Sequence, residues 1–154
     1  MQFTTYEMKA DIAKIESNVS IHCIPFEERF FEEYKKMYNE SFWEMRKSLD
    51  IKPYNFLSDY AQIRDKIEDI FILVDNGELV GSVACYSNEI DDLFVGKQFQ
   101  GKGIGKQLLL WGMNYIRIKY NSSIHLHVAE WNKKAVMLYR SVGFTIVKTE
   151  IISR

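Results

Sequence analysis

The chain lacks the features that mark several large classes of protein. Its 154 residues include only two prolines and two cysteines, so the sequence favours neither a proline-rich linker nor a disulfide framework. Cys23 and Cys85 lie in apolar stretches without the spacing of metal ligands, which predicts small buried side chains in a reducing compartment. The first residues carry no signal-peptide pattern, and no apolar run approaches the roughly 18 residues of a membrane span. We therefore expect a cytoplasmic protein that binds no membrane.

An excess of charge of one sign is also missing. The 20 lysines and arginines nearly balance the 21 aspartates and glutamates, which gives a net charge of −1. Because so weak a field does not recruit nucleic acid, no nucleic-acid partner is expected, and any site for an anion must be local. Hydrophobic residues make up 47% of the chain, and a chain of this length can bury roughly 68–70% of its unfolded surface. The composition predicts one compact domain that needs no metal to fold.

Hydrophobic periodicity predicts alternating strands and helices. Asn76 and Gly77 supply the positive φ angles of a tight turn between two apolar runs, which indicates a hairpin. Ser58 is expected to cap a short helix, and Ile118 to end the buried stripe of the helix that starts near Ile104. Strands are expected at residues 2–8, 19–24, 70–74, 79–86, 89–95, 123–129 and 144–152, and helices at 31–49, 58–67, 104–118 and 132–142. This order is typical of an α/β fold with an antiparallel hairpin and a later strand–helix–strand crossover.

A glycine-rich loop at residues 96–106 joins a predicted strand to a predicted helix. Its glycines can expose backbone N–H groups at the helix N-terminus, which is a binding site for anions. Three lysines add positive charge there, and no acid occurs between residues 93 and 129: Lys97, Lys102 and Lys106. The loop therefore suits a phosphate or pyrophosphate. Two nucleotide-binding motifs fit this loop poorly. A Walker A loop would need Ser or Thr after Gly101-Lys102, and a Rossmann loop would need a different spacing of its glycines.

The loop sequence resembles that of a known family. Gln100-Gly101-Lys102-Gly103-Ile104-Gly105 is similar to the Gln/Arg-x-x-Gly-x-Gly/Ala signature of the GNAT superfamily of acyl-CoA-dependent N-acyltransferases. A second set of residues is similar in identity and spacing to that family's other acyl-CoA motif: Val128, Asn132, Ala135, Leu138, Tyr139, Gly143 and Phe144. The resemblance implies a single α/β domain with a mixed, mostly antiparallel central sheet flanked by helices. It also implies a splayed parallel strand pair, residues 89–95 and 123–129, that forms an acyl-CoA cleft.

The resemblance assigns acetyl-CoA, as co-substrate, to this cleft. The backbone of Leu93, Phe94 and Val95 would pair with the pantetheine arm, and Asn132 and Tyr139 would contact the same arm. The pyrophosphate would bind at the glycine loop, on Gln100, Gly101, Lys102, Gly103, Ile104, Gly105 and Lys106. The likeness covers residues 19–152, so we expect an N-acetyltransferase domain at 19–154. Residues 1–18, with their strand at 2–8 and a short polar helix behind it, are expected to form an N-terminal extension whose role stays open.

Formation of an amide from a thioester and an amine needs a proton acceptor and a proton donor. The resemblance makes Tyr139 the general acid. Asp91 and Glu89 alternate on one face of a strand, and His127 lies on the facing strand, so each of the three could serve as base, with Asp91 the first choice. His125 shares a face with His127, but no third ligand is evident, so no metal is expected.

The acceptor is a primary amine of a small molecule or of a peptide, and the sequence does not choose between them. The resemblance implies an acceptor wall in the region of five aromatic residues, and the alternative for most of them is a place in the core: Phe42, Trp43, Tyr54, Phe56 and Tyr60. A non-catalytic module that binds or senses acyl-CoA, conceivably as a homodimer, is the alternative to an enzyme. A binder of nucleotide phosphates is a third and weaker interpretation.

Overall fold

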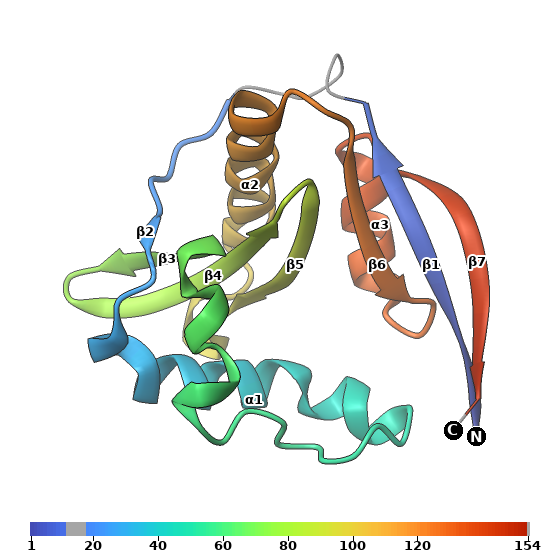
Figure 1. The fold of residues 1–154 in the computed structure, drawn as a ribbon, viewed down its shortest axis with the longest axis horizontal. Helices are drawn as coiled ribbons and strands as arrows, with labels where there is room; N and C mark the ends of the chain where they lie inside the picture. The colour runs from blue at the N-terminus through green and yellow to red at the C-terminus, as the bar shows by residue number, and fades with distance from the viewer. Residues whose placement is uncertain (12–17, 154) are drawn as a thin grey trace.

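The computed structural model describes residues 1–11 and 18–153 and contains one seven-stranded sheet (Figure 1). The strands lie in the order β2-β3-β4-β5-β6-β1-β7. Their bounds are β1 Gln2–Ala10, β2 Ile24–Pro25, β3 Ile70–Asp75, β4 Glu78–Tyr86, β5 Glu89–Val95, β6 Ile124–Ala129 and β7 Thr145–Ser153. Every neighbouring pair is antiparallel except β5 and β6, which are parallel. The predicted fold class, a mostly antiparallel sheet with one parallel pair, is confirmed.

In the described part of the chain, three α-helices and four short 3₁₀ helices connect the strands. The α-helices are α1 Phe31–Ser48, α2 Ile104–Tyr120 and α3 Lys133–Ser141, and the 3₁₀ helices are η2 Glu28–Phe30, η3 Tyr60–Gln62, η4 Arg64–Asp69 and η5 Lys97–Phe99. Alternate residues of a strand point to opposite faces. On β3, Ile70 and Ile72 enter the core beneath α1, whereas Phe71 enters the core beneath α2 and α3. The helices therefore cover both faces of the sheet.

β5 and β6 run side by side for only a short distance. They pair at Glu89 with His125 and at Ile90 with Leu126, and then part, so that the rest of β5 has no partner on that side (Figure 1). On its other side β5 pairs with β4, but the register shifts between Ser82 and Ala84. Such a shift is a β-bulge, which bends and re-aims the strand. The predicted splay of the two strands is thereby present.

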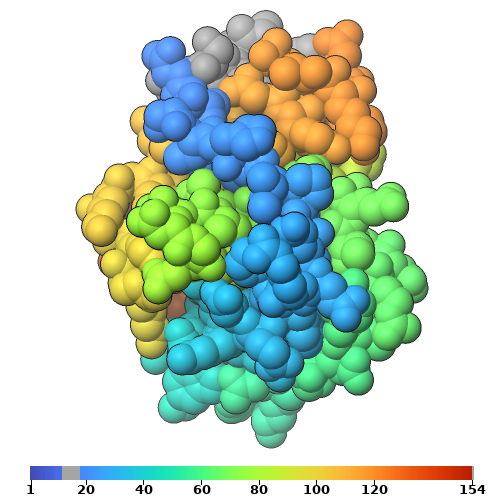
Figure 2. All heavy atoms as spheres, turned by 90° about the vertical axis from the view of Figure 1, so that its left-hand side faces the viewer, coloured from blue at the N-terminus to red at the C-terminus, as the bar shows by residue number. Residues whose placement is uncertain are grey.

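The predicted N-terminal strand occupies an inner place in the sheet. β1 pairs with β6 on one side and β7 on the other, so the strand of the expected N-terminal extension is an integral part of the sheet. The polar helix predicted behind it falls on residues outside the described part of the chain. The strand predicted at 19–24 is reduced to the two residues of β2, which pair with β3. Figure 2 shows the segment before α1, in blue, crossing one side of the molecule past the lime-green hairpin turn.

Two helix predictions also need correction. The short helix expected after Ser58 is formed instead by η3 and η4, and Asp59 caps η3 by accepting a hydrogen bond of 2.9 Å from the Ala61 N–H. In α2, Ile118 is 75% exposed. It follows the buried Ile116 by two residues, about 200° around the helix axis, and so points away from the sheet. Cys23 and Cys85 are buried and free, as predicted. No helix among the described residues is both long and apolar enough to cross a membrane.

Candidate active site

A cavity of about 730 Å³ opens where β5 and β6 part. Its walls come from both strands, from α1 and α3, and from the glycine loop before α2. Because the two strands leave their facing backbone edges unpaired, an elongated ligand can hydrogen-bond to them as an added strand would. Leu93, Phe94 and Val95 all line this cavity, and the Phe94 side chain itself is buried in the core beneath α1.

The glycine loop closes one end of the cavity and presents free backbone N–H groups to it. Gly101 and Gly103 each have φ near +80°, which L side chains rarely adopt, and a Cβ at either position would meet no atom within 4 Å. The first intrahelical bond of α2 runs from Gln107 N–H to Gly103 O. The N–H groups of Ile104, Gly105 and Lys106 therefore lie in the first turn, where a helix has no acceptor of its own. These donors and the positive end of the helix dipole fit a pyrophosphate.

The side chains of the loop divide between the cavity and the surface. Gln100 donates through Nε2 to Val95 O at 3.0 Å, which holds the loop against the end of β5. Gln100, Gly101, Gly103, Ile104 and Gly105 line the cavity, whereas Lys102 and Lys106 are exposed beside it. The two lysines thus add positive charge near the loop without forming its wall.

Tyr139 and Asn132 reach the cavity from α3 and the turn before it. Asn132 caps α3, because its Oδ1 accepts a hydrogen bond of 3.2 Å from the Ala135 N–H. Desolvation, and then the negative charge of Asp91, raises the pKa of Tyr139 to about 12. The Tyr139 hydroxyl has no hydrogen-bond partner among residues 1–11 and 18–153, so it is free to donate to a ligand.

Two adjacent carboxylates, those of Asp91 and Asp92, lie at the bulge of β5. Asp91 accepts a hydrogen bond of 2.7 Å from the Asp92 N–H. Desolvation raises the pKa of Asp91, and the negative charge of Glu89 raises it further. Asp92 has the unusual φ of 45°, and its carboxylate accepts hydrogen bonds from the Tyr38 and Tyr86 hydroxyls at 3.4 and 3.2 Å. Desolvation, followed by the charge of Asp91, raises the pKa of Asp92 to about 6.

Sequence analysis missed Asp92, although it lines the cavity beside Asp91. Strict alternation along β5 would send the two side chains to opposite faces. The bulge breaks that alternation, and no glycine marks it in the sequence. The residue type is the clue that the sequence offers to the bulge, because Asp is one of the few residues that readily adopt the positive φ observed at position 92.

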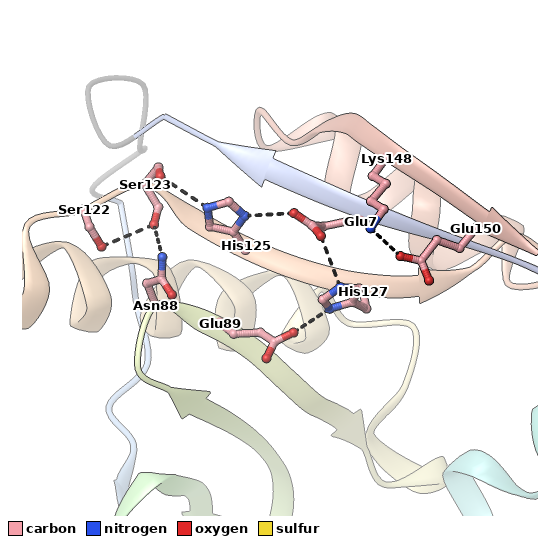
Figure 3. A network of polar contacts seen from close by, with 9 residues as sticks. All are labelled: Glu7, Asn88, Glu89, Ser122, Ser123, His125, His127, Lys148 and Glu150. Carbon is pink, nitrogen blue, oxygen red and sulfur yellow. Dashed lines mark hydrogen bonds and ion pairs between the residues drawn. The ribbon is translucent and has the colours of Figure 1, made fainter. Parts of the chain in front are cut away.

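Glu89 and His127 belong to a polar network that crosses β5, β6 and β1 (Figure 3). His127 Nδ1 lies 2.6 Å from Glu89 Oε1, and its Nε2 lies 3.5 Å from Glu7 Oε1. Glu7 also contacts His125, at 3.5 Å from Nδ1. His127 lines the cavity, whereas Glu89 reaches it only through His127. Within the described ranges, no group of three or more His, Cys, Asp or Glu is arranged to hold a metal ion.

The acceptor wall differs from the prediction. Of the five aromatic residues expected there, only Phe42 lines the cavity. Tyr38 joins it from the preceding turn of α1, and the two rings meet edge to face with centroids 4.7 Å apart. Trp43 lines a separate hollow with Lys36, Asn39 and Lys97. α1 therefore presents a different face to the cavity from the one that we expected.

Comparisons with known proteins agree with this geometry. Residues 28–144 match the family model described as the Acetyltransferase (GNAT) family. The mycothiol acetyltransferase of Corynebacterium glutamicum is 28% identical over 92 residues, which are 56% of this chain and 32% of that protein. An uncharacterized N-acetyltransferase of Methanocaldococcus jannaschii is 32% identical over 88 residues, 50% of this chain and 39% of that protein. The chain thus matches about a third of the length of these curated relatives.

Solved structures share the fold at low sequence identity. A GNAT-family acetyltransferase from Colwellia psychrerythraea has a TM-score of 0.75 at 14% identity, and the match covers 98% of this chain and 55% of that one. A protein from Pyrococcus horikoshii has a TM-score of 0.67 at 24% identity, with 88% and 99% covered. With the glycine loop, the splayed strands and a family match over residues 28–144, the chain belongs to the acetyltransferase (GNAT) family.

Proposed function

We propose that the chain transfers an acetyl group from acetyl-CoA to a primary amine of a small molecule or peptide. The observation that carries the proposal is that one cavity joins a glycine loop suited to pyrophosphate with Tyr139 and Asp91. The family match and the relatives named as acetyltransferases support the same chemistry. Acetyl-CoA would supply an activated acyl group, and the residues present fit it, because the loop has free donors and the strands have free backbone edges.

The chain must move two protons during this reaction. A C–N bond forms between the amine and the acyl carbon while the C–S bond breaks, so the amine loses a proton and the departing thiolate gains one. Tyr139 would donate a proton to the sulfur, since it lines the cavity and its hydroxyl has no hydrogen-bond partner among the described residues, and the phenolate that remains would regain a proton from water. The Tyr139 pKa near 12 keeps this donor protonated at neutral pH.

Asp91 is the proposed proton acceptor for the amine. It lines the cavity, and its negative charge acts on Tyr139. Its raised pKa makes it a stronger base than a fully solvated aspartate. Glu89 and His127 form the alternative, because the imidazole could take the proton and the carboxylate 2.6 Å away would stabilise the resulting charge. His127 lies on β6, across the gap, whereas Asp91 and Glu89 both lie on β5, so substitutions at the three positions separate the two proposals.

Replacing each candidate base tests this assignment. Asp91→Asn, Glu89→Gln and His127→Gln remove a titrating group while keeping most of its volume. The acidic limb of the kcat/KM profile against pH should disappear in Asp91→Asn and persist in the other two variants. Loss of the limb in His127→Gln instead would move the base to the histidine. An unchanged limb in all three would mean that the amine loses its proton directly to water.

Release of free thiol from acetyl-CoA, measured over a panel of amines, tests the function as a whole. The proposal expects at least one primary amine to accelerate the release, with an acetylated product of the matching mass. Tyr139→Phe should slow that reaction without weakening the binding of acetyl-CoA. Tight binding with no acceleration by any amine would contradict the proposal and favour a module that only binds acyl-CoA.

A further inference from the structure

Among the described residues, no basic side chain forms an ion pair with the carboxylates at the β5 bulge, although Lys66 and His127 act on Asp91 electrostatically. Lys66 lowers the pKa of both carboxylates, but its Nζ lies over the Tyr86 ring, 5.3 Å from the centroid, and not against either carboxylate. Two neighbouring negative charges in a partly desolvated wall are unfavourable unless a cation compensates them.

The surroundings of Asp92 suit a cation that arrives with the substrate. Its Oδ1 is held by Tyr38 and its Oδ2 by Tyr86, which fixes the carboxylate at the cavity wall. Tyr38, whose hydroxyl donates to Asp92, and Phe42, whose ring meets the Tyr38 ring edge to face, both line the cavity. Aromatic faces attract ammonium groups, and a carboxylate binds them through charge-assisted hydrogen bonds. Two other cationic side chains line the cavity. Arg46 has its guanidinium over Phe56 and its Nε bonded to Pro53 O, and Lys134 lies on α3, while Asp92 lies on β5.

We infer that the amine acceptor carries a second positive charge, and that Asp92, flanked by the Tyr38 and Phe42 rings, binds this second ammonium group while the first amine reacts. The inference rests on the proposed function, because it names the class of acceptor for that same site. An acceptor of this class is a diamine or a longer polyamine. Asp91 takes the proton of the reacting amine, and Asp92 recognises the distal charge, so the two neighbours have different tasks.

A purely structural role for Asp92 makes a different prediction. If Asp92 only held the bulge through Tyr38 and Tyr86, its replacement would slow the reaction of every acceptor to the same degree. If it binds a distal ammonium, its replacement affects only acceptors that have one. Three acceptors of matched length separate these cases: 1,5-diaminopentane, 1-aminopentane and 5-aminopentanoate, whose far ends are positive, neutral and negative at pH 7.

The experiment measures kcat and KM for the three acceptors with the wild-type chain, Asp92→Asn and Glu40→Gln. Glu40→Gln removes one negative charge from an exposed position of α1 outside the cavity, and controls for net charge. We expect the wild type to prefer the diamine over the monoamine by roughly 10-fold to 100-fold in kcat/KM, the range for a hydrogen bond between charged groups. Asp92→Asn should remove this preference through KM and leave the monoamine unchanged. Glu40→Gln should keep the preference.

Several results would overturn the inference. An equal loss for diamine and monoamine in Asp92→Asn would assign Asp92 to the bulge or to the chemistry. The absence of a diamine preference in the wild type, or a preference for 5-aminopentanoate, would exclude a distal ammonium at Asp92. Should no amine accept the acetyl group, the proposed function itself fails. The affinity for 1,5-diaminopentane, measured by calorimetry, then tests the inference separately. If the inference is right, this affinity falls in Asp92→Asn and stays unchanged in Glu40→Gln.

Discussion

A branched side chain at Gly105 should weaken the binding of acetyl-CoA without preventing the protein from folding. Gly105 is in the first turn of α2, lines the cavity, and has ordinary helical geometry, unlike Gly101 and Gly103 with their φ of +80°. A Cβ added at Gly105 would meet only Val95 Cγ2, at 3.8 Å, which is normal van der Waals contact. Both Gly105→Ala and Gly105→Val should therefore fold. Replacing a helical glycine by alanine should raise stability by up to about 1 kcal/mol, which corresponds to about 2–4 °C in Tm for a domain of this size.

The two variants should differ in binding. The motif at this position tolerates alanine, so Gly105→Ala should bind CoA as the wild type does. The branched side chain of Gly105→Val extends into the open space where a pyrophosphate must approach the N–H groups of Ile104, Gly105 and Lys106. Loss of two hydrogen bonds to a charged group costs about 3–6 kcal/mol, which raises Kd by more than about 100-fold. Titration calorimetry with CoA measures the affinity, and a thermal melt verifies folding. Wild-type affinity in a folded Gly105→Val would refute the assignment of the loop to the pyrophosphate.

Three further predictions concern side chains in or near the cavity. Tyr139→Phe keeps the ring that packs on Phe144 but loses the proton, so kcat should fall by roughly 100-fold with little change in KM for acetyl-CoA; an unchanged kcat would leave Tyr139 with packing alone. Folding raises the pKa of Asp92 to about 6, so Asp92 binds a proton more tightly in the native state than in the unfolded chain. The bound proton therefore stabilises the native state at low pH, and this stabilisation is lost as pH rises through about 6. Asp92→Asn should thus be more stable than wild type at pH 7, by about 1–3 kcal/mol, and denaturant melts should show the gap closing toward pH 4; a constant gap would contradict this. Tyr34 is fully buried, and its hydroxyl makes no hydrogen bond of good geometry among the described residues, although the Ser82 side chain is near enough to lower the pKa of Tyr34. Tyr34→Phe should therefore raise the free energy of unfolding by about 1 kcal/mol, and a lower midpoint in a urea melt would mean that Ser82 satisfies the hydroxyl.

The parts of the fold that the sequence predicts well are those with a strong local signal. The hairpin follows from Asn76 and Gly77, which have the positive φ angles of 51° and 78° that the dipeptide favours. The long helices follow from their periodic apolar residues. The strand expected at 19–24 fails because pairing with β3 involves only Ile24 and Pro25. Whether an apolar run becomes a strand depends on a neighbour elsewhere in the chain, and periodicity carries no such information.

The candidate site shows the same division between local and non-local signals. The glycine loop could be located from Gly101, Gly103 and Gly105, because a helix N-terminus is a local structure. The carboxylate side of the cavity depends on the bulge in β5, which arises from its pairing with β4. That bulge turns Asp92 toward the cavity, so a residue that alternation assigns to the opposite face becomes part of the wall. Which face of α1 lines the cavity is likewise set by packing, and the sequence led us to Trp43 where the structure has Tyr38.

The place of β1 within the sheet has a consequence for how the molecule forms. β1 precedes the other described strands in the sequence, yet both of its partners, β6 and β7, come after α2. Gln2 lies beside Ser153, 151 residues away, and Tyr6 donates to Glu130 across 124 residues. Contacts between such distant residues slow folding, since a long loop must close before they can form. During synthesis β1 therefore stays unpaired until β6 and then β7 emerge, and the wall that carries His127 is completed only after both of those strands have been made.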